Sequence, residues 1–106
     1  MYYLYVIKME VEETEKEYLK IGYSKDVTKR KAQLQGASPF LLRCIQLAGP
    51  FKLRTVRLME KNLHELFHKK RRFGEWFCVD SDDVFTELVE LTKQSNEEAN
   101  VAGFRY

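Results

Sequence analysis

The sequence predicts one small α+β domain. Segments rich in β-branched and aromatic residues alternate along the chain with segments whose apolar residues recur at helical spacing. Hydrophobic residues fill 44% of the 106 positions, and a chain of this length can build one compact core but not two. No internal repeat or interdomain linker interrupts it. We therefore expect a single domain over residues 1–95 and a C-terminal tail over residues 96–106.

Three strands are predicted in the first half of the chain. Residues 2–9 are dense in aromatic and β-branched side chains, and residues 18–23 alternate between polar and apolar. The acidic stretch between them is expected to be a solvated turn, so these two strands would form an antiparallel hairpin. Residues 41–47 are the third predicted strand, which Gly49 and Pro50 should end.

Three helices are also predicted. The first follows the second strand, where Ser24 or Asp26 can supply its N-cap. The longest helical pattern covers residues 52–69. A short extended segment separates it from the last helix, which Ser81 or Asp82 can cap and which carries an apolar stripe on one face.

The charge of the chain is strongly segregated. Residues 20–72 hold 14 Lys and Arg against 3 acidic residues, a balance of +11, whereas the remaining residues hold 4 basic and 13 acidic groups, a balance of −9. The net charge of +2 therefore conceals a basic middle between acidic ends. This pattern indicates a surface that binds a polyanion, with solvated basic helix faces as the alternative interpretation.

The sequence also indicates a compartment. The N-terminal apolar run lacks the basic segment and the cleavage site of a signal peptide, and no apolar run approaches the ~20 residues that span a bilayer. Cys44 and Cys78 stand far apart in apolar surroundings, which predicts reduced, buried thiols. We therefore expect a cytoplasmic protein without membrane contact. A zinc site is not expected, because the two cysteines, His64 and His68 lack paired-ligand spacing.

Glu60 is the most informative residue of the long predicted helix. At about 100° per residue, one face of this helix carries Leu53, Val56, Leu63 and Phe67, and Glu60 falls near its middle. A carboxylate in a buried stripe is costly unless something pairs with it. Glu60 is therefore expected either to form a salt bridge with a Lys or Arg, or to act as a metal ligand or general base in a cleft.

A second set of candidates lies on the hairpin and the first helix. Tyr5 stands in the middle of the first strand, and Lys20 lies just before Gly22 in the second. Gly22 has no side chain, so another backbone or a phosphate can approach it closely. Arg30 lies one turn after the predicted cap and points partly inward, where it can contact a phosphate or a carboxylate such as Glu60. Taken singly, Tyr5 and Lys20 also fit ordinary strand positions.

Together these residues resemble the motifs of the GIY-YIG nuclease superfamily. Tyr3-Leu4-Tyr5 stands where the superfamily has Gly-Ile-Tyr, and Lys20-Ile21-Gly22 stands where it has Tyr-Ile-Gly. The spacing from the second motif to Arg30, and then to Glu60, matches the helical arginine and the metal-binding glutamate of the superfamily. The long helix followed by Glu75-Trp76-Phe77 is similar to a branch associated with phages and prophages that carries Lys-Ile-Gly, which implies a bacterial, phage or prophage origin.

The resemblance implies a small three-stranded antiparallel sheet flanked by helices, and an endonuclease that hydrolyses DNA phosphodiester bonds with a divalent metal. Tyr5 would activate the attacking water, and Lys20 would lower the pKa of Tyr5 or contact the scissile phosphate. Arg30 would clamp that phosphate. Glu60 would hold one Mg²⁺ or Mn²⁺ ion. His64 would orient Glu60, protonate the leaving oxygen or simply pack in the core.

Basic side chains near these positions are expected to contact the phosphates of DNA. Two other functions fit the sequence: a catalytically weak or inactive nucleic-acid-binding module on the same fold, and a phage-type regulatory protein whose acidic residues 80–98 bind another protein. Because the chain has no room for a separate specificity domain, a nuclease of this size would cleave loosely or obtain its targeting from a protein partner. The predicted DNA contacts are Lys25, Lys29, Lys31, Arg57, Lys69, Lys70, Arg71 and Arg72.

Overall fold

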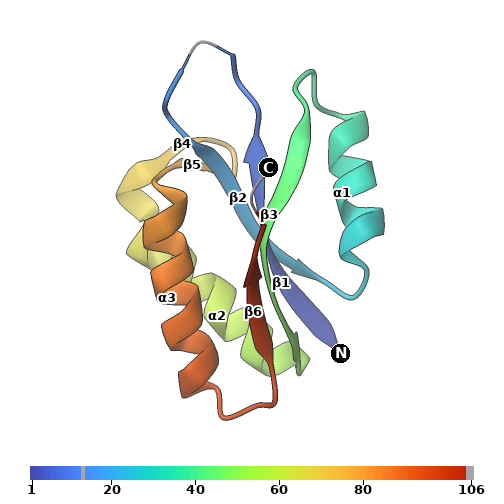
Figure 1. The fold of residues 1–106 in the computed structure, drawn as a ribbon, viewed down its shortest axis with the longest axis vertical. Helices are drawn as coiled ribbons and strands as arrows, with labels where there is room; N and C mark the ends of the chain where they lie inside the picture. Colours follow the sequence, from blue (N-terminus) through green and yellow to red (C-terminus); the bar gives the residue numbers. More distant parts are fainter. Residues whose placement is uncertain (13, 105–106) are drawn as a thin grey trace.

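The computed structural model describes residues 1–12 and 14–104, which form a six-stranded sheet with helices on both faces (Figure 1). Neighbouring strands are antiparallel throughout, in the order β4-β5-β2-β1-β3-β6. The strands are β1 (Tyr2–Met9), β2 (Tyr18–Ser24), β3 (Leu42–Phe51), β4 (Arg71–Phe73), β5 (Trp76–Cys78) and β6 (Asn100–Gly103). The helices are α1 (Val27–Gly36), α2 (Leu53–Leu66), a 3₁₀ turn η1 (His68–Lys70) and α3 (Ser81–Gln94).

The prediction of a three-stranded sheet is wrong, although the α+β class holds. The three predicted strands form the central β2-β1-β3 unit, and three short strands extend it at both edges. These strands have only three or four residues, and β4 is fully exposed, so no alternation of polar and apolar residues marks them. Strand β6 lies in the segment predicted to be a tail. Strand β3 continues through Gly49 and Pro50 instead of ending there.

The helices begin near the predicted positions. The Asp26 carboxylate caps α1 by accepting a hydrogen bond of 3.0 Å from the backbone N–H of Lys29. Asp80 caps α3. The predicted caps, Ser81 and Asp82, lie one and two residues after it and belong to the helix itself. Helix α2 ends earlier than predicted because the chain tightens into η1. In the described part of the chain, no helix has the length and apolar character needed to cross a membrane.

Helices α2 and α3 cover one face of the sheet, and α1 covers the other (Figure 1). The two-residue period of β1 separates its side chains between these faces. Leu4 and Val6 pack in the cluster that includes α2 and α3, whereas Tyr5 and Ile7 pack in the cluster beside α1. Tyr5 therefore lies on the face whose helix carries Arg30.

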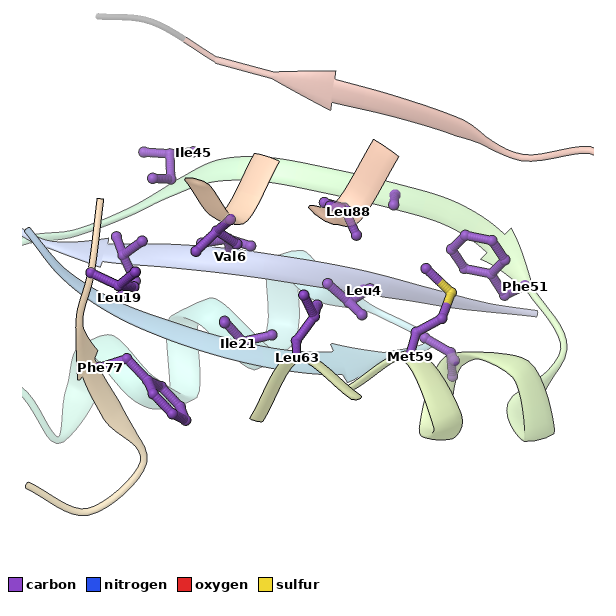
Figure 2. Close-up of a cluster of buried hydrophobic side chains, with 14 residues drawn as sticks. Leu4, Val6, Leu19, Ile21, Ile45, Phe51, Met59, Leu63, Phe77 and Leu88 are labelled. Carbon is purple, nitrogen blue, oxygen red and sulfur yellow. The ribbon is translucent and has the colours of Figure 1, made fainter. Parts of the chain in front are cut away.

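The larger core lies between the sheet and helices α2 and α3 (Figure 2). Leu4, Phe51, Leu63 and Phe77 have no exposed surface there, and each buried side chain of this kind stabilises the fold by about 1.5–3 kcal/mol. Phe77 of β5 packs in this core, so its burial fixes the short β4–β5 hairpin to the domain. The hairpin thereby places its turn beside the middle of β2.

Candidate functional site

The site begins where the pairing between β5 and β2 stops. Strand β5 pairs with β2 only from Tyr18 to Lys20. Beyond Lys20, within the described residues, β1 is the sole strand neighbour of β2, so the outer edge of β2 is open. Residues from both faces of the sheet can therefore meet around this edge at Ile21 and Gly22.

His64 of α2 binds the open edge directly. Its Nε2 lies 2.8 Å from the carbonyl oxygen of Ile21, and its ring packs against Phe77 with centroids 5.1 Å apart. A carbonyl oxygen only accepts hydrogen bonds, so Nε2 must carry the proton and donate it. Of the three roles predicted for His64, these contacts describe the packing role, which fixes α2 to β2 beside Glu60.

The Tyr5 side chain crosses β2 at Gly22. The two residues are cross-strand partners, and a Cβ atom at Gly22 would collide with the Tyr5 ring and its hydroxyl. The sequence predicted that a backbone or a phosphate approaches Gly22, but the group that does so is this ring. Because Gly22 has no side chain, the Tyr5 hydroxyl reaches towards the open edge of β2.

Arg30 of α1 lies beside the Tyr5 hydroxyl, and hydrogen bonding from its guanidinium acts to lower the pKa of Tyr5, while its Nη1 also donates to Oε1 of Gln33 at 3.5 Å. A guanidinium only donates, so the phenol keeps its own proton for a further acceptor. Burial raises the pKa of Tyr5 above its ordinary value, and the hydrogen bond and charge of Arg30 only partly offset this effect. The predicted lowering of the Tyr5 pKa by Lys20 is therefore wrong. Tyr5 is a neutral phenol at neutral pH, and Arg30 is the cation that acts on it.

Lys20 is bound to a residue that the sequence did not single out as functional. Its Nζ donates a 2.7 Å hydrogen bond to Oε2 of Glu75, in an ion pair, and lies 5.9 Å from the ring centre of Trp76. Lys20 is only 8% exposed, whereas the Glu75 side chain is 62% exposed on the turn of the β4–β5 hairpin. Bonding to Lys20 lowers the pKa of Glu75. The only sequence signal for Glu75 was its place before Trp76-Phe77.

Glu60 lies at the edge of the buried stripe of α2, not near its middle as predicted. The buried residues of this helix are Val56, Met59 and Leu63, and Glu60 is half-buried beside them. Burial raises the pKa of Glu60, and the charge of Glu75 adds to this effect, while His64 and Lys20 act against it. In the described structure no salt bridge joins Glu60 to Arg30 or to another cation, so the predicted ion pair is not formed.

The donors at this edge fit a loosely held divalent ion. Among the described residues, no three His, Cys, Asp or Glu side chains gather into a metal-binding group. Glu60 nevertheless offers a carboxylate that forms no salt bridge with any described residue, and it lies beside Tyr5 and Lys20. Mg²⁺ and Mn²⁺ accept one or two carboxylates and complete their shell with water and phosphate oxygens. The donor set therefore suits such an ion better than a metal that requires several protein ligands.

The predicted DNA contacts divide into four groups. Arg57 lines a hollow beside Glu60, and Arg71, which lies 5.3 Å from the Phe77 ring centre, acts electrostatically on Glu75. Lys25 lies over the ring of Tyr2 at 5.3 Å. Lys31 instead lines a groove between α1 and β3, away from the open edge. The remaining positions, Lys29, Lys69, Lys70 and Arg72, are exposed on α1, η1 and β4.

Residues 2–92 match the T5orf172 domain family. The chain belongs to this family. The T5orf172 domain is associated with phages and is often described as similar to GIY-YIG nucleases, which indicates a nuclease-like or DNA-binding module. The matched region includes every site residue from Tyr5 to Glu75 and stops before β6. Comparison with curated proteins and with solved structures gives no match.

We predict that Glu60→Gln stabilises the T5orf172 domain at neutral pH. Folding raises the pKa of Glu60, so the folded protein is destabilised when this group ionises. The stability is therefore lost as the pH rises from the pKa of Glu60 in the unfolded chain through its pKa in the folded protein. The neutral amide avoids this loss. Because Glu60 is only half-buried, we expect a rise in Tm of about 1–3 °C at pH 7.

This gain should vanish in acid, below the ordinary range of a glutamate, where both proteins carry a neutral side chain. Thermal denaturation at pH 3.5 and 7 measures it. Glu65→Gln, at an exposed position of the same helix, is the control. An equal Tm for wild type and Glu60→Gln at pH 7 would contradict the unpaired state of Glu60.

We also predict that His64 contributes to stability through two separable contacts. His64→Phe keeps a ring against Phe77 but loses the bond to Ile21, and it should cost about 1 kcal/mol. His64→Ala loses both contacts and should cost about 2–3 kcal/mol. Urea unfolding measures both values. Unchanged stability of His64→Phe would show that the 2.8 Å bond does not hold α2 to β2.

Proposed function

We propose that this chain is a divalent-metal-dependent endonuclease that hydrolyses DNA phosphodiester bonds in the manner of the GIY-YIG nucleases. One observation carries the proposal. Tyr5, Lys20, Arg30 and Glu60 come from four different elements and converge on the open edge of β2. Among the described residues Glu60 forms no salt bridge, and a half-buried carboxylate without one costs the fold stability, whereas phosphoryl transfer needs cations and a carboxylate at one place.

The two cations would bind the scissile phosphate. Arg30 uses part of its guanidinium on Tyr5 and Gln33 and keeps further N–H donors for phosphate oxygens. Lys20 is held by Glu75, whose side chain is largely exposed and can rotate away. A phosphate that takes the place of the Glu75 carboxylate on Lys20 exchanges one anionic partner for another, so the buried ammonium is never left unpaired.

Tyr5 would act as a neutral phenol that orients the reacting groups. Its oxygen accepts from Arg30, and its own O–H is free to bind a phosphate oxygen or the attacking water. A divalent ion held by Glu60 would polarise the phosphate, lower the pKa of a bound water and bring positive charge close to Tyr5. Glu60 must be ionised to hold the ion, so its raised pKa would make ion binding weaken as the pH falls.

A non-catalytic DNA-binding module is the second candidate. Two observations favour it: Lys20 is already paired with Glu75, and the raised pKa of Tyr5 opposes the tyrosinate that a strong general base would require. Such a module would still bind phosphates through the exposed cations of η1 and β4. Binding would then weaken with salt without any cleavage.

We predict that the purified protein nicks supercoiled plasmid in the presence of Mg²⁺ or Mn²⁺. Glu60→Gln should lower the nicking rate by about 100-fold, because it removes the only proposed protein ligand of the ion. Agarose-gel electrophoresis over time measures the rate. Glu65→Gln is the matched control, since it removes an exposed carboxylate from the same helix and should leave the rate unchanged.

Equal nicking rates for wild type and Glu60→Gln would contradict the proposed role of Glu60 as the metal ligand. Absence of nicking by wild type with either ion, together with salt-sensitive gel-shift binding, would establish the binding module instead.

We further predict that Glu75→Gln tightens binding to duplex DNA in the presence of EDTA. The wild-type carboxylate competes with phosphate for Lys20, and a half-exposed ion pair of this kind is worth a two- to fivefold change in affinity, as a rough value. Fluorescence anisotropy measures the affinity. Glu90→Gln, which removes one exposed carboxylate from α3, controls for the change in net charge. The same gain for both variants would show that Lys20 does not bind phosphate.

A further inference from the structure

A hollow of about 530 Å³ lies beside the phosphate site, between the end of β2 and the outer side of α2. Its single residue from β2 is Tyr23, and the others come from nearly two turns of α2. Glu60 stands on its rim, so the hollow adjoins the proposed ion and phosphate positions. The lining residues are Tyr23, Arg54, Arg57, Leu58, Glu60 and Lys61.

The polar part of the hollow is cationic. Arg54, Arg57 and Lys61 follow one another at intervals of three and four residues, which aligns them on one exposed side of α2. Against these three cations the lining contains the single carboxylate of Glu60. This excess of positive charge indicates an anionic ligand.

The hollow also has an apolar part that a phosphate alone would not need. The Tyr23 ring is half-buried and is held in place by Tyr2, whose ring meets it nearly edge-on at 6.1 Å and 77°. Leu58 stands among the cations with 58% of its surface exposed. A fixed aromatic ring and an aliphatic side chain between guanidinium groups suit a flat, apolar ring whose edge is polar and whose attachment is anionic.

We infer that this hollow binds the base of an unpaired nucleotide next to the phosphate held at the open edge of β2. The inference rests on the proposed function and specifies the substrate class of that site. Tyr23 and Leu58 would contact the base, and Arg54, Arg57 and Lys61 would contact its flanking phosphates. The bases of a regular duplex are stacked inside it, so they cannot enter a hollow beside the backbone. The preferred substrate is therefore single-stranded DNA or a duplex with an unpaired nucleotide.

Binding measured in EDTA tests the inference without requiring cleavage. The probes are fluorescein-labelled dT12, a perfect 12-base-pair duplex, the same duplex with one bulged thymidine, and a 12-residue strand of abasic sites. Because stacking on a side chain contributes strongly to single-strand affinity, wild type should bind dT12 and the bulged duplex about tenfold more tightly than the perfect duplex and the abasic strand.

Leu58→Glu should remove this preference by placing a carboxylate where the base binds. Its position is exposed, so the fold should tolerate the change. Leu66→Glu is the matched control, because Leu66 lies on the same helix, is 56% exposed and does not line the hollow. Both variants should weaken duplex binding equally through their charge. Only Leu58→Glu should lower the ratio of dT12 affinity to duplex affinity, by about tenfold.

Tyr23→Leu provides a second variant, with Tyr18→Leu at the other end of β2 as its control. It should reduce binding of dT12 and leave binding of the perfect duplex within about twofold. A preference for dT12 over the bulged duplex would identify single strands as the source of the unpaired base, and equal affinity would admit extruded bases as well.

Equal affinity of wild type for dT12, the abasic strand and the duplex would overturn the inference, as would equal effects of Leu58→Glu and Leu66→Glu on the affinity ratio. Either result is compatible with plasmid nicking, so the proposed endonuclease would survive it. Conversely, intact base preference without nicking in Mg²⁺ or Mn²⁺ would retain the base site and reject the endonuclease. Absence of binding to all four probes would reject the base site, and plasmid nicking in Mg²⁺ or Mn²⁺ would still decide the endonuclease.

Discussion

The site depends on the short pairing between β5 and β2. Three residues of β5 cover β2 as far as Lys20, and the core contact of Phe77 holds them there. If β5 continued, its backbone would occupy the edge at Ile21 and Gly22, and the two faces of the sheet would be separated. Because it stops, Tyr5 and Arg30 from the α1 face and Glu60 and His64 from the α2 face can act on each other. The β4–β5 hairpin thus sets both the position of the site and its limit, and its turn contributes Glu75.

Charge balance at the open edge explains why the free domain can maintain such a site. Lys20 and Arg30 are matched by Glu60 and Glu75, while Tyr5 remains neutral. A buried ammonium without a partner would cost several kcal/mol, so Lys20 needs an anion whether or not substrate is present. Glu75 supplies that anion from an exposed turn. Arg30 and Glu60 do not form a salt bridge with each other, so both charged groups remain available to bind a ligand.

The sequence predicted the long elements and the residues whose spacing along the chain is informative. Strands β1 and β2 were predicted almost as they are, and Tyr5, Lys20 and Arg30 lie on the strands and the helix that were predicted for them. Periodicity placed Glu60 near the middle of the buried stripe of α2, but Met59 occupies that position. Adjacent side chains point only about 100° apart around a helix axis, and the sequence contains no tertiary contact that decides which of the two faces the sheet. The partner of Lys20 lies 55 residues away across the β2–β5 pairing, so no local pattern could identify Glu75. The state of Tyr5 depends on burial by the folded chain, which spacing does not encode.

Glu60 provides the strongest physical argument that this edge is functional. Its own helix carries Arg57 three residues earlier, and a salt bridge between side chains at that spacing is a common and easily formed contact. In the described structure Glu60 forms none, and burial disfavours its ionised state. Replacing it with a glutamine would remove this cost without disturbing the apolar stripe of Val56, Met59 and Leu63. A carboxylate that is unfavourable to the folded domain, lines a cationic hollow and lies beside Tyr5 and Lys20 is best explained by a ligand that it binds.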